Sequence, residues 1–507
     1  QARMHLYTVV YEKVWEDARY MMVAKVSKSN LQDIEQEKFQ DLVTYSPAYS
    51  IDRIIQTYDS FSGIVGNVVK IFSAATIIFE TMSWSVLFLI LFVLPQIVVV
   101  HIRRKKIRGY QDDNVSKLKY LNYLLNVTLQ ISNFLELRVN DTFAYLKRRY
   151  QEEYDEFLHG YLKADANMYR DRTIVNVFGQ GLKFAYVVYM LSISIIRKHS
   201  LGTFKALYDY IDMTYTSVYS IFDSMSNISA LLGYDEKFFE LMDYEGFGDH
   251  EHGTQKLKKG TPQVELKNLS FSYPDDPETM VLKHIDLVVN PGEKVAFFGG
   301  DGSGKSTMVK ILSGLYQIKK GDYLLDNISV KDLDRGQLKK KVAVTFQDFI
   351  NYNFSVKENV VISGERKNIN KGLYETVSKV SLVKDFLGKE KIDDEKILGK
   401  TFPGGKELPL GYWQRLAIAR MLYRDRKIFV MDESFTFIDS ESKDTILHNI
   451  LDFIGTDRTL IYITRSIENL DMFDKIYFFE NGKIIESGNW RELMKNRKKF
   501  YKIVKEI

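Results

Sequence analysis

Hydrophobic positions are distributed unevenly along the chain, in long runs before residue 242 and in short alternating stretches after residue 262. The longest run, 85–100, is almost uninterrupted and is followed at once by the basic stretch 103–106. Such a run with basic residues at one end is typical of a membrane-spanning helix that ends on the cytosolic side. Further runs at 64–79 and 174–196 predict two more spans, so we expect residues 1–242 to form a helical membrane domain.

A fourth candidate span, 203–232, is less apolar and carries a regular row of polar residues. The row consists of Lys205, Asp209, Asp212, Thr216, Ser220, Asp223 and Asn227. Steps of three and four along the sequence place these side chains on one face of a helix. Two interpretations stay open: the face lines a transport pathway, or it packs against another helix or lies outside the bilayer.

Three segments outside the predicted spans are polar or charged. Residues 102–172 combine heavy charge with regular apolar spacing, which predicts a helical hairpin with its tip near 138–142. The segment 5–43 has the features of a second long helix pair that turns near 26–31. A polar, glycine-rich stretch, 243–262, is the expected linker to the region that follows.

Composition narrows the classes of protein to which the chain can belong. A chain of 507 residues is too long for one hydrophobic core, so two or more domains are expected. The 70 basic and 66 acidic residues nearly cancel to a net charge of +4, which offers no support for nucleic-acid binding. The absence of cysteine excludes disulfides, cysteine metal sites and a cysteine nucleophile.

Residues 299–307 spell Gly-Gly-Asp-Gly-Ser-Gly-Lys-Ser-Thr, a complete phosphate-binding loop. An apolar stretch at 294–298 predicts a buried strand before the loop, and 308–312 predicts a helix after it. Glycines let backbone N–H groups face a phosphate, Lys305 would bridge the outer phosphates, and Ser306 would offer its hydroxyl to Mg²⁺. The predicted nucleotide-binding positions in the loop are Gly300, Asp301, Gly302, Ser303, Gly304, Lys305, Ser306 and Thr307.

From residue 263 onward the chain resembles the nucleotide-binding domain of an ATP-binding cassette (ABC) transporter, and the preceding layout resembles the membrane domain of an ABC exporter. The resemblance implies an α-helical transmembrane exporter domain over 1–242, a linker over 243–262, and an α/β P-loop nucleotide-binding domain over 263–507. It also implies that the membrane domain is N-terminally incomplete, because only about four full spans are recognisable.

Several residues match positions with which the family binds and hydrolyses ATP. Tyr273 matches the aromatic residue that stacks on adenine, and Gln347 matches the glutamine that touches Mg²⁺ and the attacking water. Asp432 and Glu433 follow an apolar strand and match the magnesium partner and the general base. Asp439 matches the loop that couples two nucleotide sites across a dimer. The magnesium ligands that the resemblance implies are Ser306, Gln347 and Asp432.

One departure from the family lies at the signature segment, 408–412. The family has Leu-Ser-Gly-Gly-Gln there, whereas this chain has Leu-Pro-Leu-Gly-Tyr and keeps only Leu408 and Gly411. Gly411 remains as a backbone contact for a nucleotide held by the opposite subunit, but Pro409 has neither hydroxyl nor N–H, and Leu410 is bulky. The missing hydroxyl and N–H groups would impair the closure of two nucleotide domains on ATP. Alternatively, the substitutions are harmless because the dipole of the helix persists.

A second departure is Arg465, which stands where the family has a histidine that senses the γ-phosphate. Arginine cannot exchange a proton at neutral pH, but its planar fork can bind a phosphate bidentately and stabilise charge. We therefore expect Arg465 to act at the catalytic site, retaining ATP binding while weakening turnover.

These features predict one half of a dimeric ABC exporter that uses ATP and Mg²⁺, sits in a cell (inner) membrane, and keeps its nucleotide domain in the cytoplasm. A heterodimer is favoured over a homodimer, because a partner could supply a complete signature. The segments 39–43 and 140–145 are the expected coupling segments. The cargo would be a small molecule, drug or peptide, and the acidic residues of the polar row permit a cationic one. The alternative is an ATP-binding regulatory or structural ABC subunit with little or no hydrolysis.

Overall fold

The computed structural model describes residues 2–82, 95, 98, 99, 102, 105–107, 109, 110, 113–246, 253–334, 336–364 and 368–506. The chain divides into two compact units. Unit 1 comprises Gln1–Ser27 and Gln40–Tyr244, and unit 2 comprises Lys28–Phe39 and Glu245–Ile507. A short N-terminal piece of the chain is thus part of the second unit, which the linear division of the sequence does not predict.

The regular secondary structure among the described residues of unit 1 is helical. Its helices are α1 (Ala2–Lys28), α3 (Glu37–Met82, which starts in unit 2), α5 (Val115–Leu129), α6 (Phe134–Val139), α7 (Phe143–Ile196) and α8 (Leu201–Asp243). Helices α5 and α7 run antiparallel, because the Lys117 ammonium lies 3.6 Å from the Glu153 carboxylate while Arg149 donates to the hydroxyl of Tyr120. The chain turns between α6 and α7, so the predicted hairpin tip near 138–142 is confirmed. The predicted turn near 26–31 is also confirmed, between α1 and α2.

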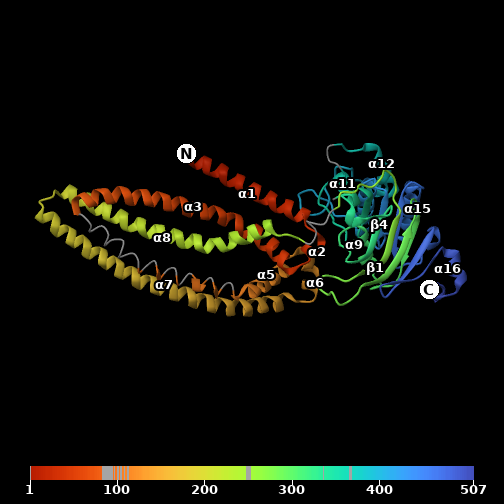
Figure 1. Cartoon of the computed structure of the whole chain (residues 1–507), viewed down its shortest axis with the longest axis horizontal. Coiled ribbons are helices and arrows are strands. Elements are labelled where there is room, and N and C mark those ends of the chain that lie inside the picture. The colour runs from red at the N-terminus through yellow and green to blue at the C-terminus, as the bar shows by residue number, and fades with distance from the viewer. Residues whose placement is uncertain are drawn as a thin grey trace. The chain divides into compact units, whose positions relative to one another are not determined.

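Helices α3, α7 and α8 lie side by side in unit 1 (Figure 1) and share a small apolar core. That core contains Ala74, Ile78, Tyr186, Met190, Leu207 and Ile211. Within the described residues, two helices are long and apolar enough to cross a membrane: Ile55–Phe79 within α3, and α7. They contain the spans predicted at 64–79 and 174–196, whereas the span predicted at 85–100 lies outside the described residues apart from three positions.

The polar row of α8 is engaged with charged partners in its own unit. Asp212 pairs with the Lys183 ammonium of α7, whose nitrogen also lies 5.1 Å from the centre of the Tyr215 ring. Asp209 pairs with Lys205 one turn earlier. Since these two carboxylates have lysine partners, they offer weaker support for a cationic cargo than their charges alone indicated.

Unit 2 contains two β-sheets. The antiparallel sheet has the order β2 (Leu282–Val289), β1 (Val264–Phe271), β4 (Lys320–Leu325), β5 (Ile328–Ser329). The other sheet has the order β10 (Lys483–Gly488), β9 (Lys475–Glu480), β3 (Lys294–Phe298), β8 (Thr459–Thr464), β7 (Ile428–Asp432), β6 (Val342–Thr345). Its strands are parallel except for β10. Strands β7 and β8 are buried at every position, because helices cover both faces of a parallel sheet.

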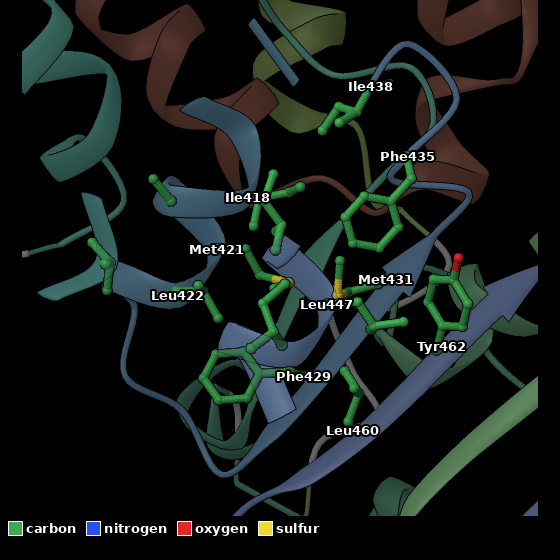
Figure 2. Packing of buried hydrophobic residues seen from close by; sticks show 14 of the residues in the cluster. Ile418, Met421, Leu422, Phe429, Met431, Phe435, Ile438, Leu447, Leu460 and Tyr462 are labelled. Carbon is green, nitrogen blue, oxygen red and sulfur yellow. The ribbon is translucent and has the colours of Figure 1, made fainter. Parts of the chain in front are cut away.

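Helices of unit 2 supply the remaining layers. They are α2 (Leu31–Ile34), α9 (Lys305–Leu312), α10 (Gln337–Lys341), α11 (Val356–Val361), α12 (Lys371–Val380), α13 (Val383–Glu390), α14 (Leu410–Tyr423), α15 (Ser440–Ile454), α16 (Trp490–Asn496) and α17 (Lys499–Glu506). Figure 2 shows side chains of α14 and α15 meeting those of β7 and β8 in one apolar core. Phe429 and Leu460 are fully buried there, so the strand ends that carry polar residues stand on a rigid base.

Candidate active site

The strand order of the parallel sheet brings three sequence motifs to one edge. Strand β8 lies between β3 and β7, and all three run in the same direction. The phosphate-binding loop follows β3, Arg465 follows β8, and Glu433 follows β7. Parallel strands end at the same edge of a sheet, which is where ligands bind in open α/β folds.

The phosphate-binding loop has the geometry that its glycines predict. Gly302 and Gly304 have φ values of 69° and 97°, in the left-handed region that favours glycine. A Cβ on Gly304 would also come within 2.6 Å of the Leu282 side chain, which would have to shift to make room. Lys305 begins α9, and its ammonium donates to the carbonyls of Gly299 and Gly300, both at 2.7 Å. Burial lowers the pKa of this ammonium, and a phosphate would offer it stronger acceptors than carbonyl oxygens.

Tyr273 lies beside the loop although it is distant in sequence. Its hydroxyl is 2.8 Å from the hydroxyl of Thr307. Its ring makes edge contacts with Phe271 and Tyr316, with ring centres 5.3 and 5.5 Å away, and the Lys310 ammonium lies 5.5 Å from its centre. The structure therefore holds an aromatic ring next to the predicted phosphate-binding residues, and the resemblance implies an adenine platform at this position.

Asp432 and Glu433 occupy different environments at the end of β7. Asp432 is 4% exposed, and its Oδ1 has no hydrogen-bond partner among the described residues. Burial, with the nearby Glu433 charge as a second cause, raises the pKa of Asp432 to about 6. Glu433 has a φ of 43°, a conformation that costs about 1 kcal/mol or more outside glycine, while its backbone N–H continues the ladder to the carbonyl of Ile463.

The predicted magnesium ligands converge on this edge. Ser306 is exposed in the first turn of α9, and Gln347 follows β6, whose Thr345 is paired with Met431 beside Asp432. A buried carboxylate oxygen without a partner, together with a hydroxyl and an amide oxygen, is a donor set that suits Mg²⁺. The residues present therefore fit the metal that the resemblance implies.

Arg465 joins two parts of the site through its guanidinium. Its Nε and Nη2 donate to the two carboxylate oxygens of Glu433, each at 2.5 Å. Its Nη1 lies 2.5 Å from the carboxylate of Asp301 in the phosphate-binding loop. The fork that we expected to bind a phosphate is thus occupied by two carboxylates of the same chain, which the sequence did not predict.

The signature segment is built differently from the phosphate-binding edge. Pro409 is the N-cap of α14 and supplies no side-chain cap, and Leu410, the first helical residue, is 50% exposed. A Cβ on Gly411 would lie 2.6 Å from the carbonyl oxygen of Phe437, so close backbone packing also requires this glycine. The Phe437 N–H donates to Gln414, which ties this helix to the 434–439 loop.

Residues 282–436 match the family described as ABC transporter. The subtilin transport ATP-binding protein SpaT of Bacillus subtilis is 26% identical over 517 residues, covering 94% of this chain and 77% of that protein. ABC transporter B family member 26, a chloroplastic protein of Arabidopsis thaliana, is 30% identical over 54% of this chain, which spans 38% of that relative's length. A bacterial Atm1-family ABC exporter solved with ATP bound has the same fold, with a TM-score of 0.75 over 99% of this chain and 87% of that one, at 18% identity.

The chain is an ABC exporter half-transporter. Its fold is an α-helical transmembrane domain followed by an α/β nucleotide-binding domain, and its nucleotide-binding domain is an ABC-type ATPase. The family assignment implies that this domain binds ATP.

The structure also shows residues in contact with this ABC domain that the sequence did not predict. Leu31 of α2 packs against the apolar core of unit 2, and the Tyr316 hydroxyl donates to Glu35, which follows α2. This N-terminal piece thus contacts the nucleotide domain at Leu31 and Glu35, before the predicted coupling segment 39–43. Tyr316 also touches Tyr273, so a short path leads from α2 to the predicted adenine platform. No local motif marks Glu35, because its partner is 281 positions away.

Arg415 is a second residue whose role no local sequence motif indicates. Its side chain is buried, and it donates to the Ser442 hydroxyl at 2.8 Å and lies 3.4 Å from the carboxylate of Asp439. Asp439 in turn caps α15 by accepting from the backbone N–H of Ser442 at 2.9 Å. These bonds fix the 434–439 loop against the signature helix, so the two predicted dimer-facing elements are held as one piece.

Proposed function

We propose that this ATP-driven exporter works as one half of an asymmetric dimer, in which its phosphate-binding edge meets a complete signature of a different partner chain. The observation that supports this is the contrast within the nucleotide domain. Lys305, Asp432 and Glu433 converge at one edge, whereas the signature helix begins with a proline cap and an exposed leucine. In a homodimer, both composite sites would carry the altered signature.

The proposed division of roles follows from position and chemistry. Tyr273 would stack on adenine, and the loop 300–307 would hold the phosphates through its N–H groups and Lys305. Glu433 would accept a proton from the attacking water, and Gln347 would orient that water. Gly411 would present its backbone N–H to the partner's nucleotide.

Mg²⁺ would be held by Ser306, Gln347 and Asp432, and when bound it neutralises charge that develops on the phosphates. The orphaned Oδ1 of Asp432 supports this assignment. Burial favours the protonated form of Asp432. A cation bound beside the carboxylate would oppose this effect and favour the ionised form.

The membrane part of the proposal concerns helices α3, α7 and α8. In this proposal the helical domain would lie in a cell (inner) membrane, and the nucleotide domain that follows the 243–262 linker would lie in the cytoplasm. Polar residues of α8 would face the transport pathway, with Lys183 and Asp212 paired at its wall. The cargo class we propose is a small molecule, drug or peptide; the relative SpaT is named for subtilin transport.

Isolation of the chain from its native membrane with an affinity tag tests the asymmetric dimer. We expect a second, different ABC chain with an intact signature to co-purify in about equal amount. We also expect the chain purified alone to hydrolyse ATP at least about tenfold more slowly than the complex, because losing two hydrogen bonds to a charged group costs several kcal/mol. A fast homodimer of the purified chain would overturn the proposal.

A regulatory subunit that binds ATP without hydrolysing it is the second candidate. The ion pair between Arg465 and Glu433 favours it, because a base held by a guanidinium is not free to accept a proton. The retention of a glutamate at this position favours the exporter. Loss of the complex's ATP hydrolysis when Glu433 is changed to glutamine would decide for the exporter.

A further inference from the structure

Three charged residues from three neighbouring strand ends form one cluster. Asp301 follows β3, Arg465 follows β8, and Glu433 follows β7, in the spatial order of the strands. Arg465 donates two hydrogen bonds to Glu433, each at 2.5 Å, and its Nη1 forms an ion pair with Asp301 at 2.5 Å. The middle strand thus provides the cation that connects its two neighbours.

Asp301 is an acidic residue within the phosphate-binding loop. Its side chain is 78% exposed, and it stands among residues that must receive a polyanion. A carboxylate beside a triphosphate is unfavourable by Coulomb repulsion unless a cation offsets it. Arg465 supplies that cation, and in doing so it is drawn toward the phosphate-binding loop while it holds Glu433.

We propose that Asp301, Arg465 and Glu433 form a latch on the catalytic base and that the γ-phosphate of ATP opens this latch. This inference rests on the function proposed above and assigns to Asp301 a regulatory role that the phosphate-loop pattern does not contain. In the latched arrangement, Arg465 neutralises Glu433 and connects it to the loop. The latch restrains water activation until a triphosphate is present.

Competition for the guanidinium explains why a triphosphate would open the latch. A γ-phosphate offers oxygens with more negative charge than a single carboxylate, and guanidinium binds phosphate in the same bidentate manner. Glu433 occupies the fork formed by Nε and Nη2, so a phosphate that binds this same fork displaces the carboxylate. ADP lacks the γ-phosphate, so it would bind beside a closed latch. Release of Glu433 is thereby linked to the nucleotide that has to be hydrolysed.

A double-mutant cycle on the full chain in its purified complex tests this latch. The variants are Asp301→Asn, Arg465→Gln and the double variant, with Glu278→Gln as a matched control that removes an exposed charge elsewhere in the nucleotide domain. Kd is measured for a non-hydrolysable ATP analogue and for ADP. If ATP must break the latch, Asp301→Asn tightens the analogue's binding about fivefold more in the wild-type background than beside Arg465→Gln.

Simple electrostatics predicts a different result. Without a latch, the charges of Asp301 and Arg465 act on the phosphates independently, so their effects on the binding free energy add and the fold-changes in Kd multiply to within about twofold. Additive effects with the analogue, or the same coupling with ADP, would therefore overturn the proposal. The control variant should leave both affinities within about twofold of the wild type. Arg465→Lys should lose the coupling like Arg465→Gln, because one ammonium lacks the planar fork that connects the two carboxylates.

The cycle also separates the latch from the proposed function on which it rests. If the wild-type complex binds neither nucleotide, the proposed function fails. If it binds both and the effects add, only the latch fails. Asp301 and Arg465 are 78% and 43% exposed, so we expect the variants to fold, with a thermal midpoint near that of the wild type.

Discussion

The two nucleotide-facing regions of this ABC domain differ in how they treat charge. The phosphate-binding edge concentrates ionisable groups, with Lys305 against loop carbonyls and Arg465 between two carboxylates. The signature region presents an exposed Leu410 behind a proline cap, and the exposed Phe437 lies in the loop that packs against Gly411. The first region is equipped to hold a polyanion, whereas the second has lost polar groups that would reach one. In the proposed dimer, one domain would therefore supply a strong half to one composite site and a weak half to the other.

The largest effect should come from the phosphate-binding edge. Changing Glu433→Gln keeps the shape of the side chain and removes the proton acceptor, so we expect the ATPase rate of the complex to fall about 100-fold or more. ATP binding should persist, because Lys305 and the loop remain. A rate that stays within twofold would show that this edge is not the catalytic one, and the contrast between the two regions would lose its functional meaning.

Repair of the signature should have the next largest effect. The double change Pro409→Ser and Leu410→Gly restores a hydroxyl, an N–H and room for close backbone approach. If the altered signature limits hydrolysis, the ATPase rate at a composite site that pairs it with an intact phosphate-binding edge should rise about tenfold. Each recovered hydrogen bond to a charged group contributes about 1.5–3 kcal/mol. An unchanged rate would mean that the substitutions are harmless and the helix dipole suffices.

Arg465→His should have a moderate effect on hydrolysis. Histidine can exchange a proton near neutral pH, and it cannot hold Glu433 through a bidentate fork. We expect the steady-state ATPase rate to rise about fivefold, with ATP affinity altered less. A rate unchanged within twofold would contradict both the latch and the weakening role of this arginine.

The smallest predicted effect is the pH dependence that Asp432 imparts to stability. Its pKa is raised by burial to about 6, so the folded protein binds a proton more tightly than the unfolded chain does. The contribution of this group is therefore most favourable below its unfolded pKa and is lost as pH rises through about 6. The thermal midpoint is measured for the wild type and Asp432→Asn at pH 5 and at pH 7.5, without Mg²⁺ and nucleotide. On going from pH 5 to pH 7.5, the midpoint of the wild type should fall about 2 °C relative to that of the variant. If the thermal midpoints of the wild type and of Asp432→Asn change equally between the two pH values, the Asp432 carboxyl lies in a solvated environment.

Local patterns predicted the secondary structure around the motifs well. Strand β3, the loop and helix α9 occur where an apolar stretch, glycines and a helical segment follow one another, and β7 ends at the carboxylate pair. The hairpin tip between α6 and α7 was also predictable, because helix-capping residues cluster there. These features depend on neighbouring residues, so a single sequence contains the necessary information.

Long-range contacts could not be predicted in the same way. Glu35 and Tyr316 are 281 positions apart, and the pairing of Lys183 with Asp212 depends on how α7 and α8 pack. The contact of Arg465 with Asp301 required knowledge of which strand lies between β3 and β7. Spacing along the chain does not contain that order, since β8 is the last of the three in sequence and the middle one in space.

The sequence by itself therefore determined the nucleotide ligand, the family and the altered signature, because each of these depends on a short run of residues with its own chemistry. The tertiary structure decided what Arg465 binds and that residues 28–39 belong to the nucleotide-domain unit. The physical reason is that strand order and helix docking are chosen by burial of apolar surface over the whole domain. Charged residues at the strand ends acquire their partners from that choice.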